Sequence, residues 1–385
     1  MASVSQLLIV NAGSSSLKLR VLGTDDAVVA SADLPAPLDP AALKDALAGF
    51  GPVDAAGHRI VHGGSLYSSA VVVDASVRRQ LEALTDLAPL HQPPALAALD
   101  AVSALMPGVP DVACFDTAFH ATIPDAASTF ALPEHWREKW RLRRYGFHGL
   151  SHAYIARRTA ELCPGASRVV SCHLGAGASL CAIHDGRSAD TTMGFTPLDG
   201  LVMATRPGSV DPGLILWLAT HARVPLDELN DALEHRSGLL GLAGDGDMRS
   251  VLERAAAGEA DAVLARDVYV HRLRSCIASM AAALGGLDAL VFTGGVGENS
   301  AEIRARTMDG LGFLGVHCDT ARNETGSGDR EIGAPDAPAR ALVISAREDI
   351  EIARQVRTTV EAPHGAPRLP SYGFSAEGGT LSAPS

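Results

Sequence analysis

The sequence lacks the features that mark several specialised classes of protein. Its six cysteines include no Cys-x-x-Cys pair and no metal-finger spacing, so we expect free, mostly buried thiols in a reducing compartment. The longest apolar run, 276–287, is too short to span a bilayer, and the first residues show neither the basic region nor the apolar core of a signal peptide. We therefore expect a cytoplasmic protein with no membrane segment.

Basic and aromatic residues are also scarce. The 32 lysines and arginines are outnumbered by 44 aspartates and glutamates, and no basic run interrupts that balance, which leaves nucleic-acid binding without support. Aromatic residues make up only 4% of the chain, so alanine, leucine, valine and glycine must fill the interior. With 385 residues, 47% of them hydrophobic, the chain is long enough for two domains with full cores.

The stretch 7–21, LLIVNAGSSSLKLRV, is predicted to form a β-hairpin. An apolar strand leads into a turn from Gly13 to Ser16, and the next strand alternates apolar residues with Lys18 and Arg20. Three hydroxyls, a glycine that lets backbone N–H groups approach a ligand, and a nearby lysine predict a cradle for phosphate oxygens. An ordinary serine and glycine turn is the alternative interpretation.

A second stretch, 169–183, repeats this plan of apolar strand, polar residue, glycine-rich turn and apolar strand. Aligned with one extra residue in the second turn, Asn11 matches His173, Gly13 matches Gly175 and Ser16 matches Ser179. The repeat predicts an internal duplication. Two phosphate-cradling turns would then face each other across a cleft.

Charged side chains stand at the ends of apolar strands. Arg59 lies between two histidines in a strand at 57–62 that ends in paired glycines, and Asp116 lies in a strand predicted at 112–120. Strand ends of this kind deliver side chains to a cleft, so we interpret Arg59 and Asp116 as site residues. A structural salt bridge for Arg59 and a turn cap for Asp116 are the alternatives. Arg206 is a lone cation in a loop rich in glycine, proline and aspartate.

The glycine-rich segment 294–300 follows a predicted strand at 287–293 and precedes a helix that would begin at Asn299 or Ser300. Strand, glycine turn and helix N-terminus together favour nucleotide binding. Two other patterns fail their context. The Gly-x-Gly-x-x-Gly at 310–315 follows a helix, and Ser151 resembles a hydrolase nucleophile without the preceding strand that such a serine needs.

Both helices and strands are expected along the rest of the chain. Helices are expected at 41–48, 77–87, 93–106, 212–222, 226–235, 247–257, 260–284 and 350–359, and further strands at 28–30 and 340–345. The composition from 361 onward, dominated by proline, glycine, serine and alanine, predicts a disordered tail.

Taken together, the chain resembles the acetokinase family of acyl-phosphate-forming kinases. The matching segments are 11–18, 58–64, 115–120, 144–152, 193–198, 205–206 and 292–300. The resemblance implies an α/β protein with a duplicated actin-like, ribonuclease-H-like ATPase fold, in which two domains surround a nucleotide cleft, and typically a homodimer. Domain I would comprise 1–120 plus 349–362 and domain II 121–348, with 363–385 as the tail.

The resemblance also implies the reaction, which is reversible transfer of the γ-phosphoryl group of ATP to acetate. The implied cofactor is Mg²⁺, for which Mn²⁺ could substitute. Arg59 would bind the acetate carboxylate, Arg206 and His148 the transferring phosphoryl group, and Asp116 would orient the arginines. The implied metal ligands are Asn11 and Glu348. The acetate pocket would comprise Arg59, Val61, Leu90, His91, Phe147 and Pro197. The ATP contacts would be Ser14, Ser16, Lys18, His173, Leu174, Gly175, Ala176, Gly177, Asp247, Met248, Arg249, Gly295, Val296, Gly297, Glu298 and Asn299.

Four departures from the family pattern are visible. Ala176 and Pro207 replace polar residues, Gln92 and Ala95 replace asparagines, and Arg347 should make the surroundings of Glu348 more basic. We expect weaker nucleotide binding from Ala176, with activity retained. Propionate or butyrate kinase remains an alternative of the same class, and an actin-like ATP switch without a small acceptor is the alternative from another class.

Overall fold

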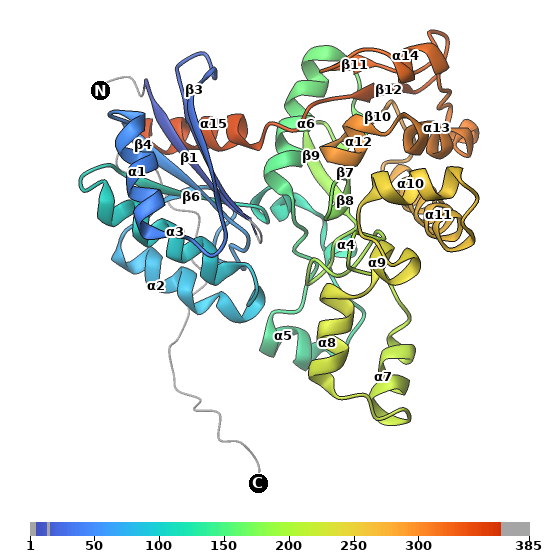
Figure 1. Ribbon diagram of the computed structural model, residues 1–385, viewed down its shortest axis with the longest axis horizontal. Coiled ribbons are helices and arrows are strands. Elements are labelled where there is room, and N and C mark those ends of the chain that lie inside the picture. Colours follow the sequence, from blue (N-terminus) through green and yellow to red (C-terminus); the bar gives the residue numbers. More distant parts are fainter. Residues whose placement is uncertain (1–4, 14–15, 363–385) are drawn as a thin grey trace.

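In the computed structural model, which describes residues 5–13 and 16–362, the chain forms two lobes (Figure 1). Each lobe is built on a mixed six-stranded sheet. The first has the order β3-β2-β1-β4-β6-β5, and its strands are β1 Leu7–Ala12, β2 Ser16–Leu22, β3 Val28–Pro35, β4 Ala55–Ile60, β5 Val71–Val72 and β6 Asp111–Phe115. The second has the order β11-β12-β10-β7-β8-β9, and its strands are β7 Arg168–Leu174, β8 Ala178–His184, β9 Arg187–Thr191, β10 Ala289–Thr293, β11 Arg330–Glu331 and β12 Arg340–Val343. Ser14 and the tail 363–385 lie outside the described residues.

The two sheets have the same topology, which confirms the predicted duplication. In each, three antiparallel strands (β1 to β3, β7 to β9) are followed by two strands parallel to the first, and a short antiparallel strand closes the edge. This is the duplicated actin-like α/β fold expected from the sequence.

The strand register corrects the residue alignment of the repeat. Asn11 pairs with Lys18 across the first hairpin, whereas His173 pairs with Ser179 across the second. Lys18 and Ser179 are therefore equivalent, and the extra residue lies in the first turn, so the match of Ser16 to Ser179 is wrong. Register follows the pairing of strand residues, not the identity of residues in the turn.

Helices cover both faces of the first sheet. On one face, α1 (Pro40–Phe50) and α3 (Gln92–Leu105) share a core with Leu8 and Val10. On the other, α15 (Glu348–Glu361) shares a core with Leu7 and Ile9. Successive residues of β1 thus face opposite helices, as the two-residue period of a strand requires. The helices α2 (Ala75–Ala83) and η1 (Thr85–Leu87) complete this lobe.

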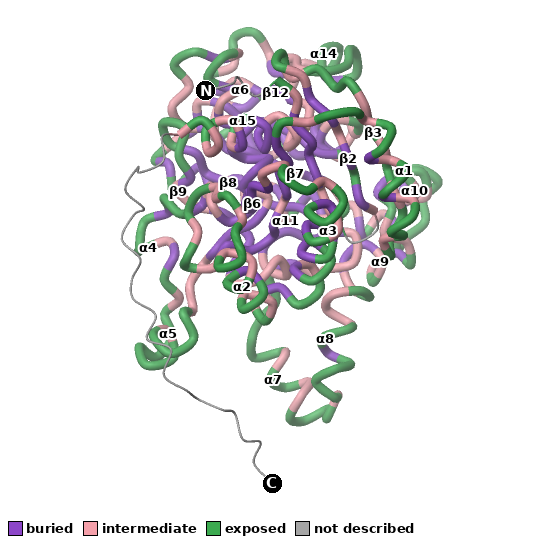
Figure 2. Tube along the Cα trace, turned by 90° about the vertical axis from the view of Figure 1, so that its left-hand side faces the viewer, coloured by how far each residue is buried: buried purple, intermediate pink, exposed green. Residues whose placement is uncertain are grey.

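The second sheet is sandwiched in the same way. Helix α11 (Ala260–Ala283) covers one face together with α9 (Gly238–Ala243) and α10 (Met248–Ala256). Helix α6 (Gly149–Leu162) covers the other. Figure 2 shows the buried residues concentrated around these sheets. The remaining helices are η2 Ala118–Thr122, α4 Asp125–Ser128, α5 Glu134–Trp140, α7 Pro212–Thr220, α8 Leu226–His235, α12 Gly294–Asn299, α13 Ala301–Asp309, η3 Gly312–Leu314 and α14 Thr320–Glu324.

The last helix links the lobes. Although α15 follows the second lobe in sequence, it packs on the first sheet and against α6 of the second lobe (Figure 1). There the fully buried carboxylate of Glu351 is paired with Arg157 on α6. In the described residues, no helix is long and apolar enough to cross a membrane.

Three predicted elements differ from the structure. The helix expected over 77–87 ends at Ala83, and 85–87 form a 3-10 turn because the amide of Leu87 bonds to the carbonyl three residues back. The strand expected over 112–120 ends at Phe115, after which the carbonyl of Asp116 accepts from the Gly149 amide. The glycine segment 294–299 is itself the helix α12, and α13 begins after the predicted cap Ser300.

Candidate functional site

The carboxyl ends of the parallel strands β1, β4 and β6 bring three predicted site residues together. Arg59 Nη2 lies 2.5 Å from Asp116 Oδ2, and its Nη1 lies 3.5 Å from Asn11 Oδ1. Asn11 Nδ2 donates to Glu348 Oε2 at 3.1 Å, which joins the first residue of α15 to the same cluster. In open α/β sheets this edge is the usual place for a ligand.

The pair of Arg59 and Asp116 is largely withdrawn from water. The side chain of Asp116 is 1% exposed and that of Arg59 is 16% exposed. Burial raises the pKa of Asp116 to about 6 although Arg59 opposes the shift, and the carboxylates of Asp116 and Glu348 raise the pKa of Arg59 against the effect of its own burial. The carboxylate of Asp116 accepts from the guanidinium of Arg59 and does not cap η2. Asp116 therefore holds Arg59 in place.

In the second lobe, His148 and Arg206 converge on Gly177. A Cβ atom at Gly177 would lie 2.9 Å from Arg206 Nη2 and 3.5 Å from His148 Nε2. Arg206 is anchored by a bond from its Nη1 to the carbonyl of Pro197 at 3.0 Å. Because Gly177 has no side chain, the guanidinium of Arg206 and the imidazole of His148 can both reach the turn between β7 and β8.

Histidines next to these arginines are held neutral. Burial lowers the pKa of His148 well below its usual value, and His173, Arg59 and Arg206 lower it further. Its ring stacks on that of His173 at a centroid distance of 4.5 Å. Burial likewise lowers the pKa of His91 to about 4, with further contributions from Arg206 and Arg59.

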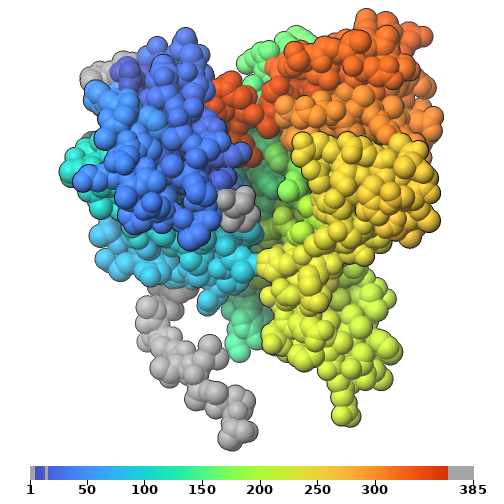
Figure 3. Space-filling view, in the orientation of Figure 1, coloured from blue at the N-terminus to red at the C-terminus, as the bar shows by residue number. Residues whose placement is uncertain are grey.

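The two groups of residues face one another between the lobes. The charge of Arg59 in the first lobe lowers the pKa of His148 and of His173 in the second lobe. The charge of Glu348 raises the pKa of Arg59, Asp116 and His173. Figure 3 shows the surface hollowed between the lobes. The centre thus offers cations and neutral imidazoles, balanced by two carboxylates.

The predicted apolar pocket is partly assembled. Val61 and Phe147, 5% and 2% exposed, belong to one hydrophobic cluster, and the ring of His62 contacts those of Tyr145 and Phe147 edge to face. Leu90, by contrast, is 44% exposed. The structure therefore brings Val61 and Phe147 together and places Pro197 against Arg206, while Leu90 faces outward.

The segments predicted to bind ATP use several of their own side chains to hold their shape. Glu298 accepts from the amides of Gly294 and Ala346 at 2.9 and 3.0 Å, and Asn299 donates to the carbonyl of Gly295 at 2.8 Å. Gly294 has φ +79°, and a Cβ there would lie 2.8 Å from the carbonyl of Leu174, so α12 packs directly against the end of β7. Backbone groups are left to meet a ligand.

Other predicted ATP residues lie at the starts of α10 and β2, and among them Met248 is buried in the core at 4% exposed. Asp247 caps α10 by accepting from the Arg249 amide and pairs with its guanidinium at 2.6 Å, while Arg249 is 87% exposed. Ser16 closes the first turn through its carbonyl, which accepts from the Gly13 amide at 2.8 Å. Lys18 is exposed beside Asn11.

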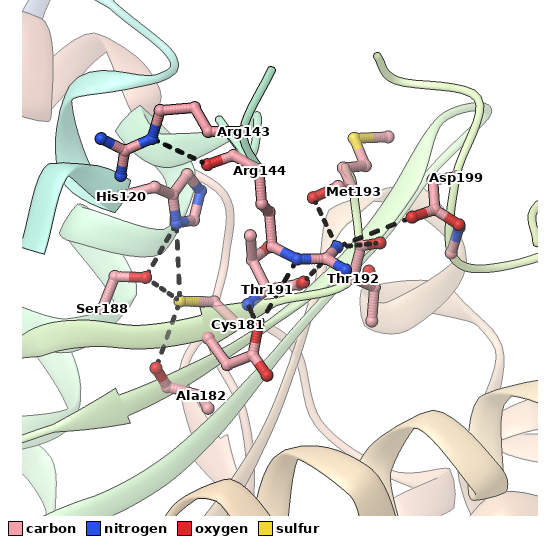
Figure 4. Close-up of polar contacts among 12 residues, drawn as sticks. His120, Arg143, Arg144, Cys181, Ala182, Ser188, Thr191, Thr192, Met193 and Asp199 are labelled. Atoms are coloured by element: carbon pink, nitrogen blue, oxygen red, sulfur yellow. Dashed lines mark hydrogen bonds and ion pairs between the residues drawn. The ribbon is translucent and has the colours of Figure 1, made fainter. Parts of the chain in front are cut away.

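Arg144 and His120 bond to the backbone of segments near the site, and Figure 4 shows the polar contacts around both residues. Arg144 Nη1 donates to the carbonyls of Thr191, Thr192 and Met193 at 3.0, 3.2 and 3.1 Å, and lies 3.6 Å from Asp199. His120 Nε2 lies 3.0 Å from the carbonyl of Phe147. Arg144 thus anchors the loop that leads to Pro197, and His120 steadies the backbone of Phe147.

The sequence did not indicate the role of Arg304. It is 1% exposed and donates to the carbonyls of Gly297 and Glu298 at 2.9 and 2.8 Å, and to Asn323 at 2.7 Å. Burial lowers its pKa to about 10. An arginine on a short helix normally faces solvent, so no sequence pattern distinguishes this one, which closes the C-terminal end of α12.

Ser151 does not behave as an exposed nucleophile. It lies in α6, it is fully buried, and its Oγ is 2.8 Å from His173 Nδ1. Residues 141–148 contain no strand, as predicted, and α6 begins at Gly149. The hydrolase alternative therefore lacks both the strand and the accessible hydroxyl that it needs.

Two departures from the family pattern have structural explanations. Gln92 is fully buried, and its amide donates to the carbonyls of His62 and Leu81, both at 3.2 Å. Arg347 pairs with Asp349, with Nε to Oδ1 at 2.9 Å. Arg347 therefore has a carboxylate partner next to Glu348, and the more basic surroundings expected for Glu348 stay a prediction.

Asn11 and Glu348 carry oxygen atoms of the kind that a metal ion would need. Among the described residues no group of three or more histidines, cysteines, aspartates or glutamates could hold one. Mg²⁺, however, is usually bound by one or two protein carboxylates together with water and substrate phosphates. The amide and carboxylate oxygens of these hydrogen-bonded neighbours fit that requirement.

Comparisons with known proteins cover both lobes. The sequence profile of the Acetokinase family matches residues 41–354. Acetate kinase from Leifsonia xyli subsp. xyli is 43% identical over 396 residues, which cover 93% of this chain and 100% of that protein. The crystal structure of Porphyromonas gingivalis acetate kinase has a TM-score of 0.86 at 33% identity, covering 93% of this chain and 100% of that one. A propionate kinase from Francisella tularensis has a TM-score of 0.85 at 34% identity, covering 91% and 98%.

Proposed function

Because this chain belongs to the acetokinase family, we propose that its cleft transfers the γ-phosphoryl group of ATP to acetate, reversibly giving acetyl phosphate and ADP. The observation that carries this proposal is the buried pair of Arg59 and Asp116 opposite Arg206 and His148. A kinase of this class needs positive charge around a phosphoryl group in transfer. The site supplies it from both lobes.

Arg59 binds the carboxylate of acetate in this mechanism. Acetate is already ionised at neutral pH, so no general base is required, and alignment is the main task. Asp116 keeps the guanidinium oriented, since their 2.5 Å bond leaves it little freedom. We assign the surroundings of the acetate methyl group to Val61, His91, Phe147 and Pro197, and we leave out Leu90 because it faces outward.

Arg206 and His148 stabilise the phosphoryl group during direct in-line displacement. Both tips face the space beside Gly177, which a side chain would fill. The guanidinium neutralises charge that spreads over the equatorial oxygens, and the imidazole donates a hydrogen bond to one of them. The reaction centre therefore lies between this turn and Arg59.

ATP lies along the turns of the second lobe. We assign its contacts to backbone groups of 173–177 and 295–299, to Asp247, Met248 and Arg249, and to Lys18 and Ser16 of the first hairpin. Asn11 and Glu348 would hold Mg²⁺, or Mn²⁺, which supplies charge neutralisation at the ATP phosphates. A Glu348→Gln variant should need more Mg²⁺ for half-maximal rate, and an unchanged requirement would remove Glu348 from this role.

The acceptor is tested by acyl hydroxamate formation with acetate, propionate and butyrate in the presence of Mg²⁺ and ATP. We expect acetate to be preferred because Val61 narrows the pocket. A Val61→Ala variant should raise kcat/KM for propionate relative to acetate by about tenfold, the usual effect of one methylene group. If no acid yields an acyl phosphate, the assignment fails and an ATP-binding switch takes its place.

We also propose a homodimer formed through α7 and α8. Leu216, Trp217 and Leu226 are 65%, 51% and 76% exposed there, and α7 contains no buried residue. Apolar surface of this kind favours a protein partner. Leu216→Glu should halve the mass measured by light scattering, whereas Phe313→Glu, at an exposed apolar residue of η3, should not.

Two further assignments rest on the same family membership. We propose that 1–120 with 349–362 and 121–348 move as the two domains that close on the substrates, since α15 packs on the first sheet. The free cysteines and the use of ATP support a cytoplasmic location. Cell fractionation tests the location, and small-angle scattering with and without a nucleotide tests the closure.

A further inference from the structure

A chain of hydrogen bonds leads from the interior of the second lobe to His148. Ser171 Oγ lies 2.9 Å from His152 Nδ1, His152 Nε2 lies 2.9 Å from Ser179 Oγ, and Ser179 Oγ lies 2.9 Å from His148 Nδ1. Ser171, His152 and Ser179 are fully buried. The hydrogen bonds among these residues therefore fix where their protons lie, without competition from bulk water.

Three packed elements fix this chain. Ser171 belongs to β7, Ser179 to the neighbouring strand β8, and His152 to α6, which covers that face of the sheet. His148 immediately precedes α6 with φ 56°. Its ring is thus presented to the cleft by the same helix that carries His152.

The state of His148 decides what it can do in the site. Neighbours on every side disfavour a second proton on its ring: His173 on β7, His152 on α6, Arg59 on β4 and Arg206 from the loop after β9. A neutral imidazole carries only one N–H, and the ring has two nitrogens. Only the form with the proton on Nε2 can donate toward Gly177, where the phosphoryl group would lie.

Counting protons along the chain selects a direction. Ser171 Oγ has one hydrogen-bond partner among the described residues, His152 Nδ1. If Ser171 accepted from that nitrogen, its own buried hydrogen would be left without an acceptor, which is unfavourable. Ser171 therefore donates, His152 Nε2 donates to Ser179, and Ser179 donates to His148 Nδ1.

We propose that Ser171, His152 and Ser179 are positioning residues that fix His148 in the tautomer whose Nε2 carries the proton. The role of that proton as a donor to the phosphoryl group rests on the proposed function. The tautomer itself follows from the buried contacts alone. Ser179 is the decisive member, because its hydroxyl hydrogen occupies His148 Nδ1.

The test combines kinetics with the tautomer measured by ¹⁵N NMR of histidine-labelled protein. We expect the wild type to show His148 protonated at Nε2. Ser179→Ala should shift it toward a mixture of tautomers and lower kcat about tenfold, with the KM for acetate and for ATP changed less than twofold. Ser179→Thr keeps the hydroxyl and should restore both the tautomer and most of the rate.

Thr307→Ala is the matched control. It removes another fully buried hydroxyl, whose Oγ1 donates to the carbonyl of Ile303 at 2.7 Å, and that bond stays within α13. The control should keep kcat within about twofold of the wild type. If Ser179→Ala does not fold, Ser171→Ala takes its place with the same expected shift in tautomer.

Two results would overturn the proposal. One is a wild-type His148 protonated at Nδ1, and the other is a Ser179→Ala enzyme with the tautomer and kcat of the wild type. An absence of acyl phosphate from the wild type would count against the proposed function instead. The NMR measurement would still decide the tautomer in that case.

Discussion

Replacing Asp116 by asparagine isolates the charge that holds Arg59. Asparagine keeps the shape of the side chain, but it leaves the 1% exposed position without the carboxylate that lies 2.5 Å from Nη2. Breaking a buried ion pair by removing one charge costs about 3–5 kcal/mol. That cost falls on the stability of the fold. For catalysis, a misplacement of about 1 Å at a positioning group costs about a hundredfold, so we expect about a hundredfold decrease in kcat/KM.

The assay is acetyl hydroxamate formation over a range of acetate concentrations at saturating ATP and Mg²⁺. We expect KM for acetate to rise and kcat to fall together, since a freed Arg59 aligns the carboxylate poorly both before and during transfer. Thermal unfolding of the same variant measures how much of the loss is instability.

Asp111→Asn is the matched control because Asp111 begins the strand that Asp116 follows. It pairs with His58 at 2.7 Å, so both aspartates join β6 to β4 through a buried contact, but at opposite ends. The control should lower stability with little change in kcat/KM. The reasoning is refuted if Asp116→Asn stays within threefold of the wild type, or if both variants lose activity in proportion to stability.

Three further predictions concern the same centre. Burial raises the pKa of Asp116 from 3.8 to about 6, so kcat/KM should fall tenfold per unit below about pH 6. The raised pKa also stabilises the folded state as pH falls through 6, so the decrease in kcat/KM should occur before unfolding. Asp116→Asn should abolish this pH dependence. Gly177→Ala would place a methyl group 2.9 Å from Arg206 and should lower kcat at least tenfold, whereas Gly49→Ala, which meets open space, should not. Arg304→Leu leaves buried carbonyl groups without their donor, so it should lower stability by about 3 kcal/mol in denaturant titration and raise KM for ATP, and an unchanged KM would separate Arg304 from the nucleotide.

Local patterns in the sequence determined the repeated architecture. Apolar runs on both sides of a glycine-rich turn with serine in 7–21 and 169–183 predict the two hairpins, and the alternation of apolar and charged residues in 17–21 marks a strand that buries every second side chain. The same logic placed Arg59 and Asp116 at the ends of strands, where a parallel sheet binds ligands. The family resemblance supplied roles for these residues that the patterns alone left open.

Only the tertiary structure decided which distant groups meet. Asn11 and Glu348 are hydrogen-bonded although 337 positions separate them, because α15 returns from the second lobe to cover the first sheet. The equivalence of Lys18 and Ser179, the burial of Arg304 and the contacts of Ser179 with two histidines also depend on strand register and on helices packed across the sheet. Such contacts leave no periodic trace in sequence, since each is fixed by elements that pack together only after the chain has folded.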